Sequence, residues 1–176
     1  MQNTEIQDIQ RIFSTRLATL EQILSLGEKH VAGEGEMAMD AVLQARLAPD
    51  MFPLGTQIAF ACNQPRGFAL WCAGQPYENL DPEVKTLAVA RSYIQNTLSE
   101  LAAIEALDTK LDEIKRTGLG PGLYCETPGR LYVSDYLMPN FYFHITTSYA
   151  ILRNLGVPLG KADYMGFLMP HVRQES

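Results

Sequence analysis

The stretch TEIQDIQRIFSTRLATLEQILSLGEKHV, residues 4–31, contains the clearest indication of the fold. Its apolar residues recur at steps of three and four, which places them on one face of a long helix. These residues are Ile6, Ile9, Phe13, Leu17, Leu20 and Leu24. A helix with one apolar face buries that face by packing on other elements. The stretch therefore predicts a helical protein in which this segment is one member of a bundle.

Three more segments have the helical pattern, and they are residues 50–73, 81–107 and 139–155. Pro49–Asp50 is expected to open the second helix and Asp81–Pro82 the third, because proline suits a first turn and aspartate an N-cap. The link between these helices is then about eight residues, too short to run back along the second helix. The second and third helices should therefore be antiparallel. The direction of the last helix stays open.

Glycine and proline cluster between the third and fourth helices. Residues 123–127 (LYCET) and 130–136 (RLYVSDY) have the composition of short strands, and Thr127–Pro128–Gly129–Arg130 is typical of a hairpin turn. The sequence thus predicts an all-α four-helix bundle with a small β-hairpin between helices 3 and 4. We expect residues 1–176 to form a single domain, since this length is that of one ordinary domain.

Composition excludes several classes of function. The formal net charge is -6, which disfavours nucleic acid as a partner. No apolar run is long enough to cross a membrane. The polar first residues do not predict a signal peptide, and three irregularly spaced cysteines do not make a disulfide framework. We therefore expect a soluble, cytoplasmic protein.

Two histidines and one carboxylate are candidate site residues. His30 ends the first helix and Asp50 opens the second, so both should lie at one end of the bundle. His144 joins them if the last helix runs parallel to the second. Such a cluster can hold a metal or exchange protons. The alternatives are that His30 is an exposed helix-end cation, that Asp50 charges a helix start, and that His144 is buried and bonded to a neighbouring helix.

Two further polar residues lie within helical segments. For Gln57, in the second predicted helix, there are two alternatives: its side chain lines a pocket, or it faces solvent. Arg153 lies in an apolar stretch of the last helix and would need a partner if buried, for which Asp50 is a candidate. Anion binding is the alternative for Arg153. The predicted ligand-binding residues are therefore His144, Asp50, His30, Gln57 and Arg153, and no catalytic residue is predicted.

Four stretches together resemble an uncharacterised bacterial family, the domain of unknown function numbered nineteen ninety-three. They are residues 46–58 (RLAPDMFPLGTQI), 70–76 (LWCAGQP), 137–157 (LMPNFYFHITTSYAILRNLGV) and 159–166 (LGKADYMG). That family belongs to the DinB/YfiT-like helical bundle superfamily. The resemblance implies a four-helix bundle that is often a homodimer and has no established activity.

The wider superfamily resembles metalloenzymes with three histidines, one from the second helix and two at i and i+4 in the fourth. This sequence departs from that pattern, because the predicted second helix has no histidine and Ser148 follows His144 at i+4. The resemblance therefore does not carry the metal site over, and we expect a small-molecule-binding protein with no metal site and no cofactor. The alternatives are a metal- or thiol-dependent transferase, in which a metal ion would bind, and a structural homodimer. Whether the protein is an enzyme stays open.

Overall fold

The bundle consists of four long helices, as the sequence predicts. The computed structural model describes residues 4–32 and 37–174. The long helices are α1 (Glu5–Val31), α3 (Leu54–Cys72), α4 (Leu87–Ala102) and α6 (Met138–Asn154). The shorter elements are α2 (Met37–Val42), the 3₁₀ segment Asp108–Asp112, β1 (Ile114–Gly120), β2 (Leu123–Pro128), α5 (Gly129–Leu131), the π-helical segment Tyr132–Leu137, α7 (Lys161–Tyr164) and the 3₁₀ segment Gly166–His171.

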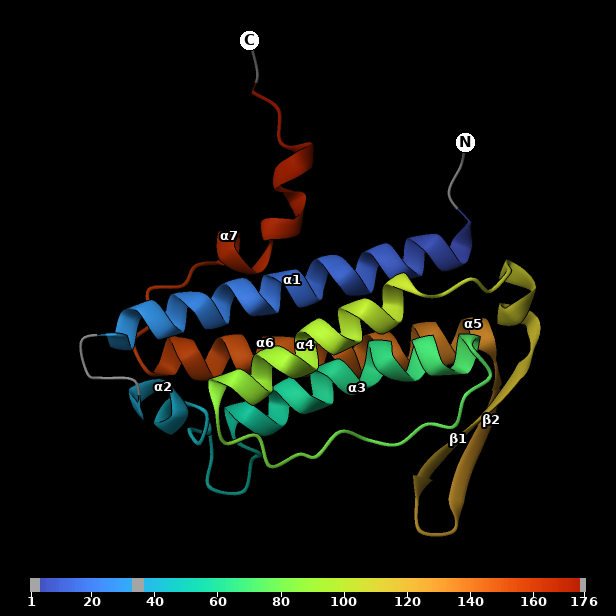
Figure 1. Ribbon diagram of the computed structural model, residues 1–176, viewed down its shortest axis with the longest axis horizontal. Coiled ribbons are helices and arrows are strands. Elements are labelled where there is room, and N and C mark those ends of the chain that lie inside the picture. Colours follow the sequence, from blue (N-terminus) through green and yellow to red (C-terminus); the bar gives the residue numbers. More distant parts are fainter. Residues whose placement is uncertain (1–3, 33–36, 175–176) are drawn as a thin grey trace.

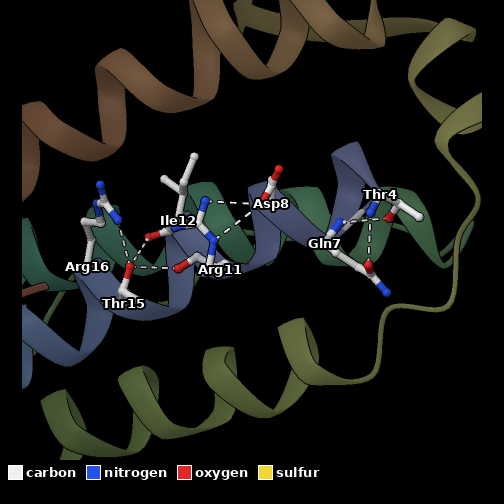
Figure 2. A network of polar contacts seen from close by, with 7 residues as sticks. All are labelled: Thr4, Gln7, Asp8, Arg11, Ile12, Thr15 and Arg16. Atoms are coloured by element: carbon white, nitrogen blue, oxygen red, sulfur yellow. Dashed lines mark hydrogen bonds and ion pairs between the residues drawn. The ribbon is translucent and has the colours of Figure 1, made fainter. Parts of the chain in front are cut away.

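The N-terminus of α1 is held by side chains from two parts of the chain. Thr4 Oγ1 accepts from the backbone N–H of Gln7 at 3.2 Å, and Gln7 Oε1 accepts from the N–H of Thr4 at 3.0 Å (Figure 2). This reciprocal capping satisfies amides that have no partner inside the helix. Asp108 accepts from the next two amides, those of Glu5 and Ile6, at 3.0 Å each.

Three phenylalanines form the centre of the core. Phe13 of α1, Phe68 of α3 and Phe141 of α6 are fully buried. The ring centroid of Phe13 lies 5.9 Å from that of Phe68 and 5.0 Å from that of Phe141. These contacts fix the three helices against one another, and Phe13 belongs to the apolar face predicted for residues 4–31.

The direction of α6, which the sequence leaves open, follows from its contacts. Trp71 at the end of α3 contacts Tyr132, just before α6, with ring centroids 5.5 Å apart. Gln57 near the start of α3 contacts His144, well inside α6, at 2.8 Å. The two helices are therefore antiparallel, and Figure 1 shows them running side by side in opposite directions.

The prediction that the second and third helices are antiparallel is wrong, because α3 and α4 run parallel. Near their starts, the backbones at Gly55 and Val84 touch, and farther along Arg66 Nε lies 3.2 Å from Glu100 Oε1. Helix α4, the third of the predicted helices, begins at Leu87 with Thr86 as its N-cap, and not at Asp81–Pro82. The connection 73–86 can span roughly 45 Å when extended, whereas α3 is about 28 Å long. Figure 1 shows this connection returning along the bundle.

The predicted hairpin exists, but only one of its strands is the expected one. Residues 123–127 lie in β2 as predicted, and their partner is β1, with Thr117 opposite Cys125. The turn uses Gly120 and Gly122, whose φ angles of +124° and +75° suit glycine. Residues 130–136, predicted as a strand, are helical, and they continue into α6. Within the described ranges, residues 4–32 and 37–174, no helix is long and apolar enough to cross a membrane.

Candidate functional site

His144 and Gln57 meet across the seam between α3 and α6. His144 Nδ1 lies 2.8 Å from Gln57 Oε1. Gln57 lies in the first turn of α3 and is buried, whereas His144 is partly buried in the second turn of α6. Of the five predicted ligand-binding residues, these two are brought together.

The second hydrogen bond of Gln57 fixes the tautomer of His144. Gln57 Nε2 donates to the carbonyl oxygen of Phe52 at 3.2 Å. The amide oxygen of Gln57 therefore faces His144 and can only accept, so Nδ1 of the imidazole must carry the proton. Nε2 then keeps its lone pair, and within the described residues it has no hydrogen-bond partner. His144 presents an unused acceptor in a fixed orientation.

His144 also stays neutral over most of the pH range. Burial lowers its pKa from 6.5 to about 4, because a charged imidazolium loses hydration in this setting. The ring centroids of Phe60 and Phe143 each lie 5.3 Å from that of His144, and both ring pairs meet edge to face. At neutral pH the residue is therefore a hydrogen-bond acceptor and not a cation.

Two of the aromatic rings near His144 are exposed to solvent. Phe52 contacts Phe60 with centroids 5.3 Å apart. Phe52 is 59% exposed and Phe143 is 57% exposed. We call Phe52, Phe60, Phe143 and His144 the aromatic patch. Exposed rings of this size beside a fixed polar atom are typical of binding surfaces. Sequence reasoning missed the three phenylalanines, although the adjacency of Phe143 and His144 was a visible signal.

The other three predicted residues make no hydrogen bond or ion pair with His144 among the described residues. His30 is exposed at the end of α1, and its Nε2 would be 3.9 Å from a Cβ placed on Gly156. Gly156 is twelve residues after His144, about 18 Å along a helix axis, so His30 does not reach His144. Asp50 is exposed in the turn before α3, and Arg153 is exposed in the last turn of α6. Within the described residues, Arg153 and Asp50 form no ion pair with each other.

The residues present do not fit the three-histidine metal site of the superfamily. One helix supplies Gln57, and α6 supplies His144 and Ser148 at the i and i+4 positions. The oxygen of Gln57 is occupied by His144. Ser148 is fully buried, and its hydroxyl donates to the carbonyl oxygen of His144 at 2.8 Å. Only the Nε2 atom of His144 is free as a metal ligand. In the part of the chain that the structure describes, no group of three or more His, Cys, Asp or Glu residues is placed to hold a metal ion.

Two of the cysteines are unsuited to nucleophilic chemistry. Burial raises the pKa of Cys62 and that of Cys72 to about 12 each. Both side chains are therefore thiols and not thiolates at neutral pH, and the thiolate is the reactive form. Cys125 lies on β2, as predicted, and is free like the other two.

Comparison with known proteins agrees with this fold. The model of the family described as a domain of unknown function (DUF1993) matches residues 7–165. Among solved structures, a DinB family member protein from Shewanella denitrificans superposes with a TM-score of 0.80 and is 31% identical in sequence. The match covers 95% of this chain and 94% of that one. No curated protein matches the chain.

Proposed function

The chain belongs to the DUF1993 family and has the DinB-family fold, and we propose that it is a small-molecule-binding protein whose ligand contacts His144. The observation that carries this proposal is the pair of hydrogen bonds made by Gln57, to His144 and to the carbonyl of Phe52. They leave Nε2 of His144 as an oriented, unpaired acceptor. Gln57 acts in this proposal by holding His144 in position.

The chemistry around Nε2 indicates the class of ligand. A neutral acceptor at neutral pH pairs with an N–H or O–H donor rather than with an anion. The surrounding rings of Phe52, Phe60 and Phe143 offer edges and faces to a flat apolar body. The ligand that fits best is therefore a small aromatic molecule with one N–H or O–H donor.

Indole and 1-methylindole test this proposal, because they differ in the single N–H donor. Titration calorimetry should show saturable binding of indole and binding of 1-methylindole that is about tenfold weaker, the effect of one hydrogen bond of about 1.4 kcal/mol. ¹⁵N-NMR of the imidazole should show Nδ1–H and unprotonated Nε2 before indole is added. Equal affinity for the two compounds, or an Nε2–H tautomer, would refute the role of His144.

Substitutions separate the acceptor from the ring. His144→Phe keeps an aromatic ring between Phe60 and Phe143 and removes the acceptor, so indole should lose its advantage over 1-methylindole. His30→Gln is the matched control, because His30 is exposed at the far end of α1 and should leave indole binding unchanged. Loss of the advantage in both variants would place the site elsewhere.

The exposed rings also favour a second candidate, contact with another copy of the chain. Phe52 and Phe143 are each more than half exposed, and large apolar groups of this kind are common in dimer interfaces. Sedimentation velocity over a range of concentrations tests this homodimer. A dimer that dissociates in Phe143→Ser but not in Leu107→Ser, another exposed apolar position, would assign the aromatic patch to self-association. A monomer at all concentrations would eliminate that use.

A further inference from the structure

A cavity of about 300 Å³ lies beside the hairpin, away from the aromatic patch. Its walls come from α3, the connection 73–86, β1 and the π-helical segment Tyr132–Leu137. It meets the α3–α6 seam at Gln64 and Leu137, each seven residues from Gln57 or His144. Seven residues are about 10 Å of helix, so the cavity and the aromatic patch are separate places on one seam.

The charge of the cavity is opposite to that of the protein. The described residues that line it include Lys115 and Arg116 and no carboxylate, although the whole chain has a formal net charge of -6. Within the described residues, Lys115 forms no ion pair, while the nearby Lys110 pairs with Glu113 at 2.6 Å. Burial and the charge of Lys110 lower the pKa of Lys115. An anion bound in the cavity would stabilise the charged form of Lys115 against both its burial and the repulsion from Lys110.

A second polar group in the cavity also has no partner. The hydroxyl oxygen of Thr117 is buried and makes no hydrogen bond with the described residues. Lys115 and Thr117 are two apart on β1, so both point to the same face of the strand, and both are partly buried. A buried hydroxyl without a partner is uncommon and destabilises the folded protein. A ligand atom would complete its hydrogen bonding.

The opposite wall is aromatic. Tyr132 and Tyr136 are stacked, with ring centroids 5.8 Å apart and planes 16° apart. Both come from the π-helical segment, a rare conformation that is frequent at functional sites. Tyr77 lines the cavity as well, and burial raises the pKa of all three tyrosines. Their hydroxyls are thus protonated at neutral pH, and that of Tyr77 already donates to Asn79 Oδ1.

We propose that this cavity binds a small organic carboxylate, with Lys115 and the Thr117 hydroxyl on the carboxylate and the Tyr132 and Tyr136 rings against the apolar body. Among the described residues, Lys115 has no ion pair and its Nζ lies 5.6 Å from the Tyr132 ring centroid, while the Thr117 hydroxyl has no hydrogen bond; both residues lie on one face of β1. The stacked rings give the apolar body a surface that inorganic anions do not use. This site shares no residue with the one around His144, so the two proposals stand or fall separately.

Benzoate, benzamide and inorganic phosphate are the probes for titration calorimetry on the full chain. Benzoate should bind at one site per chain, and benzamide, the uncharged analogue, should bind about tenfold or more weakly, because a hydrogen bond to a charged group is stronger than a neutral one. Phosphate should bind more weakly than benzoate. Phosphate binding as tight as benzoate binding would show a general anion site and refute the carboxylate assignment.

Two variants of β1 and one control complete the test. Lys115→Gln and Thr117→Val should each weaken benzoate binding, the first by about tenfold or more. Lys161→Gln removes an exposed lysine of α7, far from β1 in the chain, and should change nothing. Circular dichroism checks that each variant folds. In the unaltered protein, benzoate should shift the backbone amide NMR signals of residues 115–118. Undiminished binding in Lys115→Gln, or no shift in those signals, would overturn the proposal.

Discussion

Replacing Gly55 with alanine is expected to destabilise the protein, because this glycine is where α3 touches the returning connection 73–86. A Cβ added to Gly55 would lie 2.3 Å from the carbonyl oxygen of Val84 and 3.1 Å from its Cβ. The Val84 side chain is buried, and Gln44 Nε2 donates to the Val84 carbonyl at 3.3 Å. The connection therefore cannot move aside without losing contacts of its own.

The size of the effect follows from two opposing contributions. Overpacking at a closed contact costs about 1–3 kcal/mol, whereas the better helix propensity of alanine returns at most about 1 kcal/mol. Because the added Cβ would meet a backbone oxygen at 2.3 Å, the cost of overpacking should lie in the upper part of this range, and the net loss of unfolding free energy should be about 1–2 kcal/mol. For a chain of this size that corresponds to a fall in Tm of roughly 3–6 °C.

Urea and thermal denaturation followed by circular dichroism measure this loss. Gly118→Ala is the matched control, because a Cβ at Gly118 meets nothing within 4 Å, and it should change stability by less than about 0.5 kcal/mol. A Gly55→Ala protein as stable as the wild type would contradict the close approach of Gly55 to Val84. The parallel arrangement of α3 and α4 would then lose its main local support.

Three other perturbations have clear expected results. The backbone amides of Ile6 and Glu5 donate to Asp108 and lower the pKa of its carboxyl group from the usual 3.8. Asp108→Ala removes this acceptor. It should lower the Tm at pH 7, and the difference should close in acid as the wild-type carboxylate becomes protonated. Arg91→Met breaks the ion pairs of α4 with Glu21 and Glu28 on α1, both at 2.8 Å; it should cost about 1 kcal/mol, less at high salt in denaturation experiments. For His144, with a pKa of about 4 in the folded state against 6.5 unfolded, the unfolded chain takes up the proton first. Stability should therefore decline as the pH falls from 6.5 to 4, and His144→Phe should flatten this part of the urea-denaturation profile.

The helices were predictable where their own sequence carries the signal. Residues 4–31 contain both the cap and the apolar face, and α1 spans Glu5–Val31. The third helix shows where such signals mislead. Asp81 does accept a hydrogen bond from the N–H of Glu83 at 2.9 Å, as a cap would, but the turn does not continue into a helix. Nothing local in the sequence distinguishes this turn from a helix start.

The return of the connection 73–86 depends on contacts between residues far apart in the chain. Asn63 Oδ1 accepts from the N–H of Leu80 at 2.9 Å, and the hydroxyl of Thr56 donates to the carbonyl of Pro82 at 2.8 Å. Side chains of α3 thus satisfy the backbone of an extended segment that has no ladder of its own. Without these partners in view, a short link and an antiparallel pair were the simpler prediction.

The prediction of a strand for residues 130–136 is wrong for a related reason. RLYVSDY contains two tyrosines and a valine, residue types that favour a strand, yet the preceding Gly129 packs against Trp71 so closely that an added Cβ would lie 2.3 Å from the Trp71 ring. This contact ties the chain to the end of α3. From there the helical segment continues to α6, with Tyr132 and Tyr136 stacked within it.

For the candidate site, the sequence indicated Gln57 and His144 separately but not the contact between them. The sequence was equally compatible with Gln57 at the surface, because a glutamine in a helix does not contribute to the apolar periodicity. Only the antiparallel packing of α3 on α6 places its amide against His144, and only the bond from Gln57 to the Phe52 carbonyl orients that amide. Ser148, four residues after His144, donates its hydroxyl proton to the backbone carbonyl of His144. The three side chains therefore leave a single free atom, Nε2 of His144, and one neutral acceptor among phenylalanine rings suits a hydrogen-bonding organic ligand better than a metal ion that needs several ligands.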